Sequence, residues 1–239
     1  MSAALLACLL GPLVLGTPFC ADDPHFLEGA ERETFLGELE SRMAARKSVV
    51  AEFEQEKVLA LFEEPLKSRG AILFEAPTDC ASCGKLRWEI LEPFRSILIV
   101  AGKDVAKFEF TSDGERRVLE LGRAKDPLLA VMDQIRGWFL GRFDRRESSY
   151  ALKVARQPEP MIVLEPKDAG LKRNMRAIEV RLASELDGVR SVTILEVSGD
   201  RTTMRFQERR KDLAIPAACF DLRAPAELEL EKLLPGPGK

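Results

Sequence analysis

The feature that most constrains the fold is an alternation of apolar and polar residues that recurs along most of the chain. In one clear ribbon, Ala106, Phe108 and Phe110 alternate with Lys107 and Glu109. Side chains of a strand point alternately to opposite faces, so one face of this ribbon seeks apolar cover. The chain therefore predicts a large sheet with one apolar side, filled either by protein or by a ligand.

Turn residues separate the alternating segments, and Asp113-Gly114 is the strongest hairpin signal among them. A first strand follows Val49, where the period changes from helical to alternating. In the segment 85–91 the charged residues face away from the apolar ones, which predicts a solvated outer face. Further strands are expected at 69–75, 85–91, 96–101, 104–111, 115–122, 149–157, 160–165, 175–183, 188–198, 202–210 and 217–222.

Two amphipathic helices interrupt this pattern. Phe35, Leu36, Leu39 and Met43 recur at helical spacing and predict a helix over about 30–47. The second helix begins at Asp126-Pro127, with the carboxylate as N-cap and proline at the first helical position. One of its faces is apolar, so this inserted helix is well placed to cover the open side of a sheet. That face carries Leu128, Leu129, Met132, Ile135 and Phe139.

The charge balance and the N-terminus narrow the class of protein. The 36 basic and 39 acidic residues leave a net charge of -3, which excludes a nucleic-acid partner because phosphate binding needs a concentrated basic surface. Residues 1–21 carry no charged side chain, and the apolar run from Leu5 to Leu15 predicts a signal peptide. We expect one domain over residues 30–225 and a flexible C-terminal tail over 226–239.

No set of residues suited to catalysis stands out, so we do not expect an enzyme. His25 is the only histidine and lies in a polar stretch, which leaves a catalytic triad or a metal site incomplete. Cys80 and Cys83 lie in a turn between strands, where a small disulfide is the expected role in an oxidising compartment. A redox role for this pair stays open. We expect neither a metal nor a cofactor.

A set of short motifs resembles the outer-membrane lipoprotein carrier family, the LolA-like proteins. Their order and spacing carry the resemblance, which covers about residues 33–225. In the first half the motifs are Phe53-Glu-Gln55, Gly70 to Pro77, Leu86-Arg-Trp88, Glu92-Pro93 and Ser96 to Lys103. In the second half they are Val163 to Pro166, Gly199 to Phe206 and Cys219 to Pro225.

The resemblance implies an incomplete, half-open antiparallel β-barrel, mainly β with α, covered by the N-terminal helix and the inserted lid helix. Such a protein holds the acyl chains of a lipoprotein in an apolar cavity during transit through the periplasm. Its expected partners are an acylated lipoprotein or lipid cargo, a releasing transporter in the inner membrane and an acceptor at the outer membrane. We expect a monomer. Relatives carry an arginine that holds the lid shut where this chain has Ala76, so the latch differs here.

The expected lipid-binding residues combine one face of the strands with the apolar stripe of the inserted helix. For any one of them, packing in a protein-filled core is an equal alternative, because alternation shows only that a face is dry. A sensor with the same half-barrel and a thiol oxidoreductase using Cys80 and Cys83 are the competing functions. The expected cavity wall is Phe53, Leu86, Trp88, Phe108, Phe110, Met204 and Phe206, and the expected lid is Leu128, Met132, Ile135 and Phe139.

Overall fold

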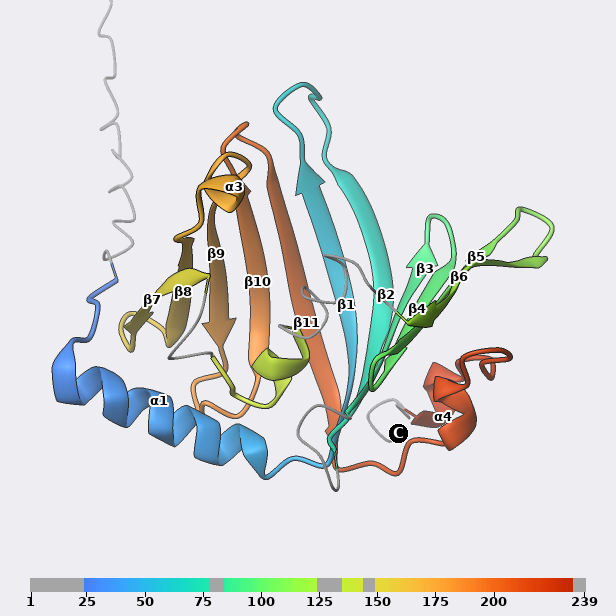
Figure 1. The fold of residues 1–239 in the computed structure, drawn as a ribbon, viewed down its shortest axis with the longest axis horizontal. Coiled ribbons are helices and arrows are strands. Elements are labelled where there is room, and N and C mark those ends of the chain that lie inside the picture. The colour runs from blue at the N-terminus through green and yellow to red at the C-terminus, as the bar shows by residue number, and fades with distance from the viewer. Residues whose placement is uncertain (1–23, 78–83, 124–134, 144–148, 234–239) are drawn as a thin grey trace, which may run out of the picture.

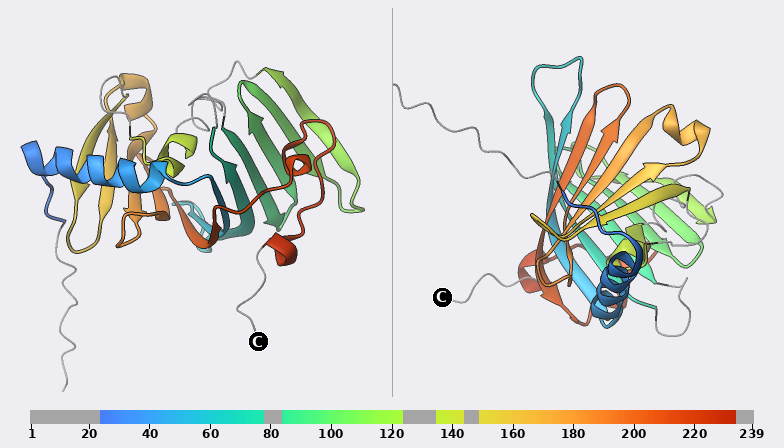
Figure 2. Two further views of the ribbon diagram at one scale, coloured as in Figure 1. Left: turned by 90° about the horizontal axis from the view of Figure 1, so that it is seen from below. Right: turned by 90° about the vertical axis from the view of Figure 1, so that its left-hand side faces the viewer.

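A computed structural model describes residues 24–77, 84–123, 135–143 and 149–233. Its described strands form one antiparallel sheet of 11 strands, in the order β6-β5-β4-β3-β2-β1-β11-β10-β9-β8-β7 (Figure 1). The strands are β1 (Ser48–Val58), β2 (Leu66–Glu75), β3 (Lys85–Glu92), β4 (Ser96–Ala101), β5 (Asp104–Phe110), β6 (Arg116–Arg123), β7 (Tyr150–Ala155), β8 (Met161–Pro166), β9 (Met175–Leu182), β10 (Val189–Glu196) and β11 (Arg201–Lys211). The sheet curves without closing, which confirms the predicted mainly β, half-open architecture (Figure 2).

The predicted N-terminal helix is confirmed as α1 (Gly29–Ala44), and residues 135–139 of the inserted helix are also helical. Short helices follow at α3 (Ala169–Lys172), η1 (Ala217–Phe220) and α4 (Leu230–Leu233). The expected signal peptide, the start of the inserted helix and the Cys80–Cys83 turn lie outside the described residues.

The strand predicted at 217–222 is wrong, because residues 217–220 form the single 3-10 turn η1. Pro216 precedes this turn, and its carbonyl accepts a hydrogen bond from the Cys219 amide at 2.9 Å. Cys219 and Phe220 are both buried against the same sheet face, whereas neighbours in a strand would point to opposite faces. The closed turn therefore allows two adjacent side chains to pack on one side.

The strand register divides the sheet into two faces. Trp88 lies opposite Ile72 on β2 and opposite Leu98 on β4, so these three side chains share one face. Arg87 lies opposite Leu73 and Ile99, which therefore share the other. We call the face that carries Trp88 the inner face, because α1 and the helical residues 135–139 pack on it. The face that carries Arg87 is the outer face.

Helix α1 covers the inner face of β7 to β10. Its four apolar residues at helical spacing are all buried, and they pack against alternate residues of those strands. The burial of this stripe is the reason the helix forms where it does, because isolated helices of this length are only marginally stable in water. In Figure 2, α1 lies across one half of the curved sheet.

The outer face of β2 to β5 is covered by the segment that follows β11. This segment buries Ile215, Cys219 and Phe220 against apolar residues of the sheet. Ala226 and Glu227, at the start of the expected tail over 226–239, contact the sheet. The Ala226 carbonyl accepts a hydrogen bond from Arg87 at 2.8 Å, and Glu227 forms an ion pair with Arg95 at 2.6 Å.

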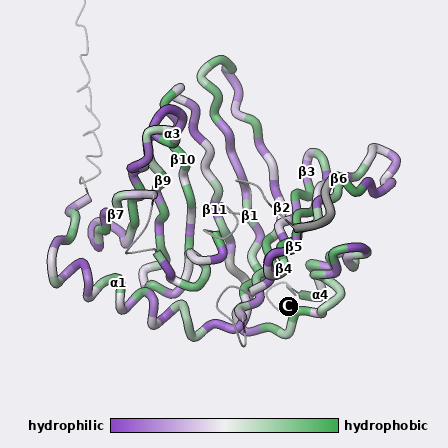
Figure 3. Tube along the Cα trace, viewed as in Figure 1, coloured by the Kyte–Doolittle hydropathy of each residue, from purple (hydrophilic) through white to green (hydrophobic). Residues whose placement is uncertain are grey.

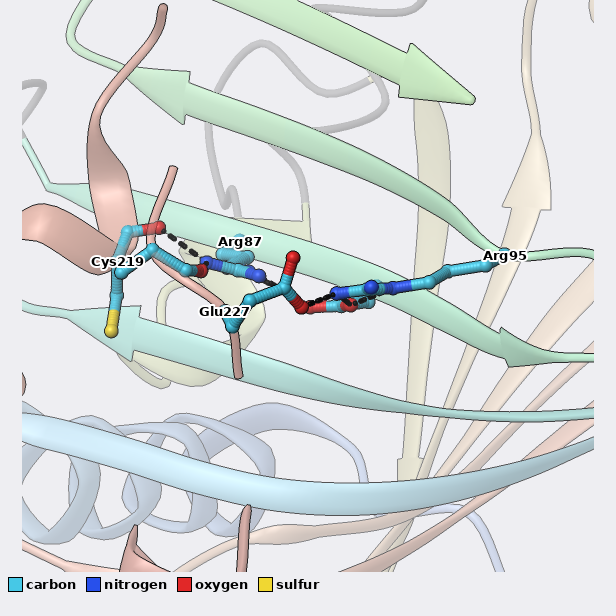
Figure 4. Close-up of polar contacts among 6 residues, drawn as sticks. Arg87, Arg95, Cys219 and Glu227 are labelled. Atoms are coloured by element: carbon cyan, nitrogen blue, oxygen red, sulfur yellow. Dashed lines mark hydrogen bonds and ion pairs between the residues drawn. The ribbon is translucent and has the colours of Figure 1, made fainter. Parts of the chain in front are cut away.

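A partly buried ion network fastens this C-terminal segment (Figure 4). Arg87 and Glu89, expected to face solvent, are fully buried and form an ion pair at 2.6 Å. Arg87 also donates to the Cys219 carbonyl at 3.0 Å, and Arg95 reaches Glu89 at 2.8 Å. Partial burial opposes the charge of Arg95, but its pairs with Glu227 and Glu89 outweigh this and raise its pKa. The network holds the C-terminal segment against the outer face.

Candidate functional site

An apolar cavity of about 170 Å³ lies between the helical residues 135–139 and the inner face of the sheet. Strands β3, β7, β9, β10 and β11 supply its wall, and the helix supplies its roof. The cavity is lined by Trp88, Ile135, Trp138, Phe139, Tyr150, Met175, Ile178, Val189, Val192, Ile194, Met204 and Phe206.

Aromatic contacts join the roof to the wall. The Phe206 ring meets Phe139 of the helix edge to face, with ring centroids 6.0 Å apart, and meets Trp88 in the same way at 6.5 Å. Phe53 lies beside Trp88, with ring centroids 4.8 Å apart. Such pairs contribute about 0.5–1.5 kcal/mol each beyond the area that they bury. The rings therefore hold the helix against the sheet without any charged group in the cavity.

Gly70, which lies opposite Phe53 on β2, leaves the space that the Phe53 ring occupies. A Cβ atom built on Gly70 would lie 2.7 Å from the ring and 2.0 Å from the Glu89 carbonyl oxygen. Only glycine fits so close an approach of a ring and a neighbouring strand. Gly70 thus allows the aromatic wall to extend from β3 to β1.

Tyr150 brings a hydroxyl group to this otherwise apolar lining. A tyrosine hydroxyl is neutral at physiological pH, and burial raises its pKa further above that range. An uncharged lining with few polar groups suits a hydrocarbon ligand, because an unpaired polar group in such a space would be costly. The volume of about 170 Å³ is close to the roughly 150 Å³ of an apolar cavity that holds benzene, and below the roughly 300 Å³ at which ordinary ligand pockets begin.

Arg136 attaches the helix to the end of the sheet. Its side chain is only 7 % exposed, and Nη1 donates a hydrogen bond of 2.7 Å to the Gly84 carbonyl, just before β3. The Gly102 carbonyl, in the β4–β5 turn, accepts longer bonds of 3.4 and 3.3 Å from the two Nη atoms. This buried guanidinium therefore ties the helix to two backbone carbonyls.

Gly141 places the other end of the helix against α1. Its φ of +69° is a left-handed conformation that glycine adopts without strain. A Cβ atom there would lie 2.9 Å from Met43 Cβ and 3.0 Å from the Leu39 carbonyl oxygen. The chain after the helix thus turns sharply and packs directly on the α1 backbone.

The structure brings most of the expected site residues together. Trp88, Ile135, Phe139, Met204 and Phe206 line the cavity. Phe53 and Leu86 lie on the same face beside it, where Leu86 packs with residues of the roof. Leu128, Met132, Cys80 and Cys83 lie outside the described residues.

Phe108 and Phe110 do not join this cluster, because they lie on the outer face. Phe108 is opposite Ile97 on β4, and Ile97 is opposite Glu89 on β3. Phe108 packs with the C-terminal segment, and the Arg95 guanidinium lies 4.2 Å from the Phe110 ring centroid. The apolar face expected for β5 is buried, but it faces away from the cavity.

The second half of the chain supplies cavity residues that were not expected to form the site. Alternation in β9 and β10 was the available signal, since Ile178 and Val192 belong to the apolar sides of those strands. Their share in the cavity follows only from pairing with β11, which places Val192 opposite Met204. The lining residues missed are Trp138, Tyr150, Met175, Ile178, Val189, Val192 and Ile194.

The described residues contain neither a cluster of metal ligands nor a membrane-spanning helix. In those parts of the chain, no group of three or more His, Cys, Asp or Glu side chains could hold a metal ion. Within the same residues, no helix has the length and apolar character needed to cross a membrane.

A single curved antiparallel sheet, with helices over an apolar inner face, defines a half-barrel with a covered hydrophobic interior. The family described as "Outer membrane lipoprotein carrier protein LolA" matches residues 44–223. The chain therefore belongs to the LolA family. An outer-membrane lipoprotein carrier protein of Dechloromonas aromatica (strain RCB) is 27% identical over 184 residues, which cover 75% of this chain and 79% of that protein.

Solved structures similar to this chain include two of low sequence identity. A DUF1329 family protein from Desulfovibrio piger is 8% identical with a TM-score of 0.47, over 84% of this chain and 100% of that chain. A LolA superfamily protein from Nitrosomonas europaea is 11% identical with a TM-score of 0.36, over 79% of this chain and 96% of that chain.

Proposed function

We propose that this chain is a periplasmic carrier that binds the acyl chains of lipoproteins, or of another lipid, and moves them from the inner towards the outer membrane. The observation that carries the proposal is the uncharged cavity between the inner face and the helix 135–139. Membership of the LolA family and the lipoprotein carrier of Dechloromonas aromatica support it. The apolar run within residues 1–21 supports export.

The physical need for a carrier follows from the cargo. At about 0.8 kcal/mol per buried methylene, an acyl chain of about 16 carbons that leaves a membrane for water loses on the order of 12 kcal/mol. A cavity wall of Trp, Phe, Met and Ile side chains restores an apolar environment for the chain. The carrier must also release its cargo, so the binding site must open.

Loading requires the helix to move, because about 170 Å³ is too small for a long acyl chain. We propose that residues 135–141 act as a lid. Opening breaks the hydrogen bonds of Arg136 to Gly84 and Gly102 and separates Phe139 from Phe206. In relatives, the resemblance assigns the role of holding the lid shut to an arginine at the position of Ala76. Arg136 would fill that role here. Here the arginine belongs to the lid and its acceptors belong to the sheet.

Transfer at each membrane follows from the same movement. A releasing transporter in the inner membrane would hand the acyl chains to the open form, and an acceptor at the outer membrane would receive them. Closing around the cargo buries the same apolar surface that the lid buries when empty. The lid therefore exchanges one apolar partner for another, which keeps loading and release close in free energy.

Native mass spectrometry of the protein purified from the periplasm without detergent tests the proposal. Organic extraction of any bound molecule then identifies the cargo. We expect bound acylated protein or lipid on the unmodified chain and a loss on Ile135→Asp, which places a charge in the cavity lining.

Leu119→Asp is the matched control, because Leu119 is exposed on β6 and does not line the cavity. It should keep the bound mass. A protein that carries no lipid and takes up no fluorescent fatty acid would show that the inner face is an ordinary core. The family fold would then serve another function.

A further inference from the structure

The end of the half-barrel opposite α1 exposes large apolar side chains on three turns. Five of the eight large apolar side chains that the described residues expose lie here. Strands β2, β4 and β11 begin at these turns, which places all three at one end of the antiparallel sheet (Figure 1). We call this end the rim, and its exposed apolar residues are Leu61, Phe62, Leu66, Phe94 and Val197.

The tip of the β1–β2 hairpin is the most exposed part of the rim. Leu61 is 94% exposed and Phe62 63% exposed, and Figure 3 shows the tip as a hydrophobic segment. The Phe62 amide donates to the Leu59 carbonyl at 3.0 Å, and the Ala60 amide donates to Asp200 Oδ1 at 2.8 Å. These bonds close the tip and tie it to the β10–β11 turn. The tip is therefore an ordered turn that holds two apolar side chains in water.

Such a turn is unusual for a surface that stays in water. Turns are normally built from Gly, Pro, Asn, Asp and Ser, which tolerate their backbone geometry and exposure. Leu61 and Phe62 gain nothing from solvent, so their place at the farthest point of the hairpin indicates contact with something apolar.

The register connects the rim to the cavity. On the inner face, Phe53 lies opposite Phe206 and Gln55 opposite Met204 on β11. Two residues farther along β1, Lys57 lies opposite Leu66 of the rim. Four residues of strand span about 13 Å, so the aromatic wall and the rim are close neighbours along β1. An acyl chain that leaves the cavity along β1 therefore reaches the rim directly.

We propose that the rim docks on the surface of a lipid bilayer, with Leu61 and Phe62 inserted at the boundary between headgroups and acyl chains. This inference rests on the proposed function, since a carrier of acyl chains must meet a bilayer or its lipids. A bilayer fits better than a protein partner because the apolar residues lie on separate projecting turns. Charged residues such as Glu63, Glu64 and Lys67 lie among them, whereas a protein interface has a continuous apolar core.

Flotation with vesicles of phosphatidylethanolamine and phosphatidylglycerol tests the proposal. The double variant Leu61→Ser/Phe62→Ser should lower the ratio of vesicle-bound to free protein by at least about tenfold, because two large side chains no longer leave water. The matched control is Val118→Ser/Leu119→Ser, since these β6 residues are 54% and 50% exposed but lie away from the rim. It should float like the unmodified protein.

A second measurement separates the rim from the cavity. Uptake of a fluorescent fatty acid from solution should be the same for the rim variant and the unmodified protein, since the cavity is unchanged. If the unmodified protein takes up no fluorescent fatty acid, the carrier function is refuted. Flotation tests membrane docking of the rim independently of that result. The thermal unfolding midpoint checks that the variant folds, and Leu61→Trp should shift its fluorescence to the blue on vesicles.

Equal flotation of the rim variant and the unmodified protein would overturn the proposal. Failure of the unmodified protein to float would do so as well. Binding that appears only when the vesicles contain a membrane protein would assign the rim to a protein partner, and would likewise overturn it.

Discussion

Replacing Arg136 by Met should open the lid. The 2.7 Å bond from its charged group to the Gly84 carbonyl contributes about 1.5–3 kcal/mol, and the bonds of 3.3–3.4 Å to Gly102 contribute less. Methionine keeps most of the apolar stem but donates no hydrogen bond. We therefore expect the closed form to lose about 2 kcal/mol relative to the open form, which is roughly a 30-fold shift in the opening equilibrium.

Hydrogen exchange of the lid amides measures this shift. The amides of Leu140, Gly141 and Arg142 donate to carbonyls of residues 136–138. So short a helix is not stable in water on its own, so opening exposes these amides and their exchange reports whether the lid is closed. Their exchange should accelerate by about the same 30-fold in Arg136→Met, if the lid opens as a unit. Amides of the β1–β11 pairing should be unchanged. Arg142→Met is the matched control, because Arg142 is exposed at the end of the same segment.

Two outcomes would refute this reasoning. Exchange of the lid amides within about threefold of the unmodified protein would mean that Arg136 does not hold the lid. Equal acceleration of the lid and of the β1–β11 amides would mean that Arg136 stabilises the whole fold and not the closed lid. Arg136→Lys should lie between the two proteins, because an ammonium group cannot reach two carbonyls with the geometry of a guanidinium.

Two further substitutions test the packing of each face. Gly141→Ala should destabilise the protein by about 1–3 kcal/mol more than Gly102→Ala in urea unfolding. Both glycines have positive φ, but only a Cβ atom on Gly141 would meet Met43. Equal losses of stability would show that packing on α1 is unimportant. Arg87→Met should lose about 3 kcal/mol in the same assay because it leaves Glu89 buried with one partner fewer, and the added substitution Glu89→Met should restore part of this. A double variant less stable than Arg87→Met would contradict that account.

Alternation predicted most of the fold because nearly every strand has one dry side. The strand boundaries lie within a few residues of those expected, and the turns at Glu92-Pro93, Gly102 and Asp113-Gly114 fall where they were predicted. The 217–222 segment was mistaken for a strand because its apolar residues also fit a short ribbon. Cys219 and Phe220 instead pack side by side on the sheet, which a sequence pattern alone does not reveal.

The candidate site was predicted only in part, because alternation within a strand does not say which face of the sheet is which. Phe108 and Trp88 both lie on dry sides, yet the register places them on opposite faces. Arg87 and Glu89 were expected in solvent because they alternate with apolar residues, and a distant segment of the chain covers them. Contacts between segments so far apart in sequence decide both cases.

The two faces of the sheet are closed by different kinds of interaction, and this difference suits a carrier. On the outer face, Arg87 and Glu89 are buried together beneath the C-terminal segment. Opening that face would expose or separate a buried ion pair, which is expensive. On the inner face, the lid is held by apolar contacts and by Arg136, whose carbonyl partners water can replace. In the proposed function, cargo would supply the apolar contacts again, so the inner face would open and reload while the outer face keeps the sheet intact.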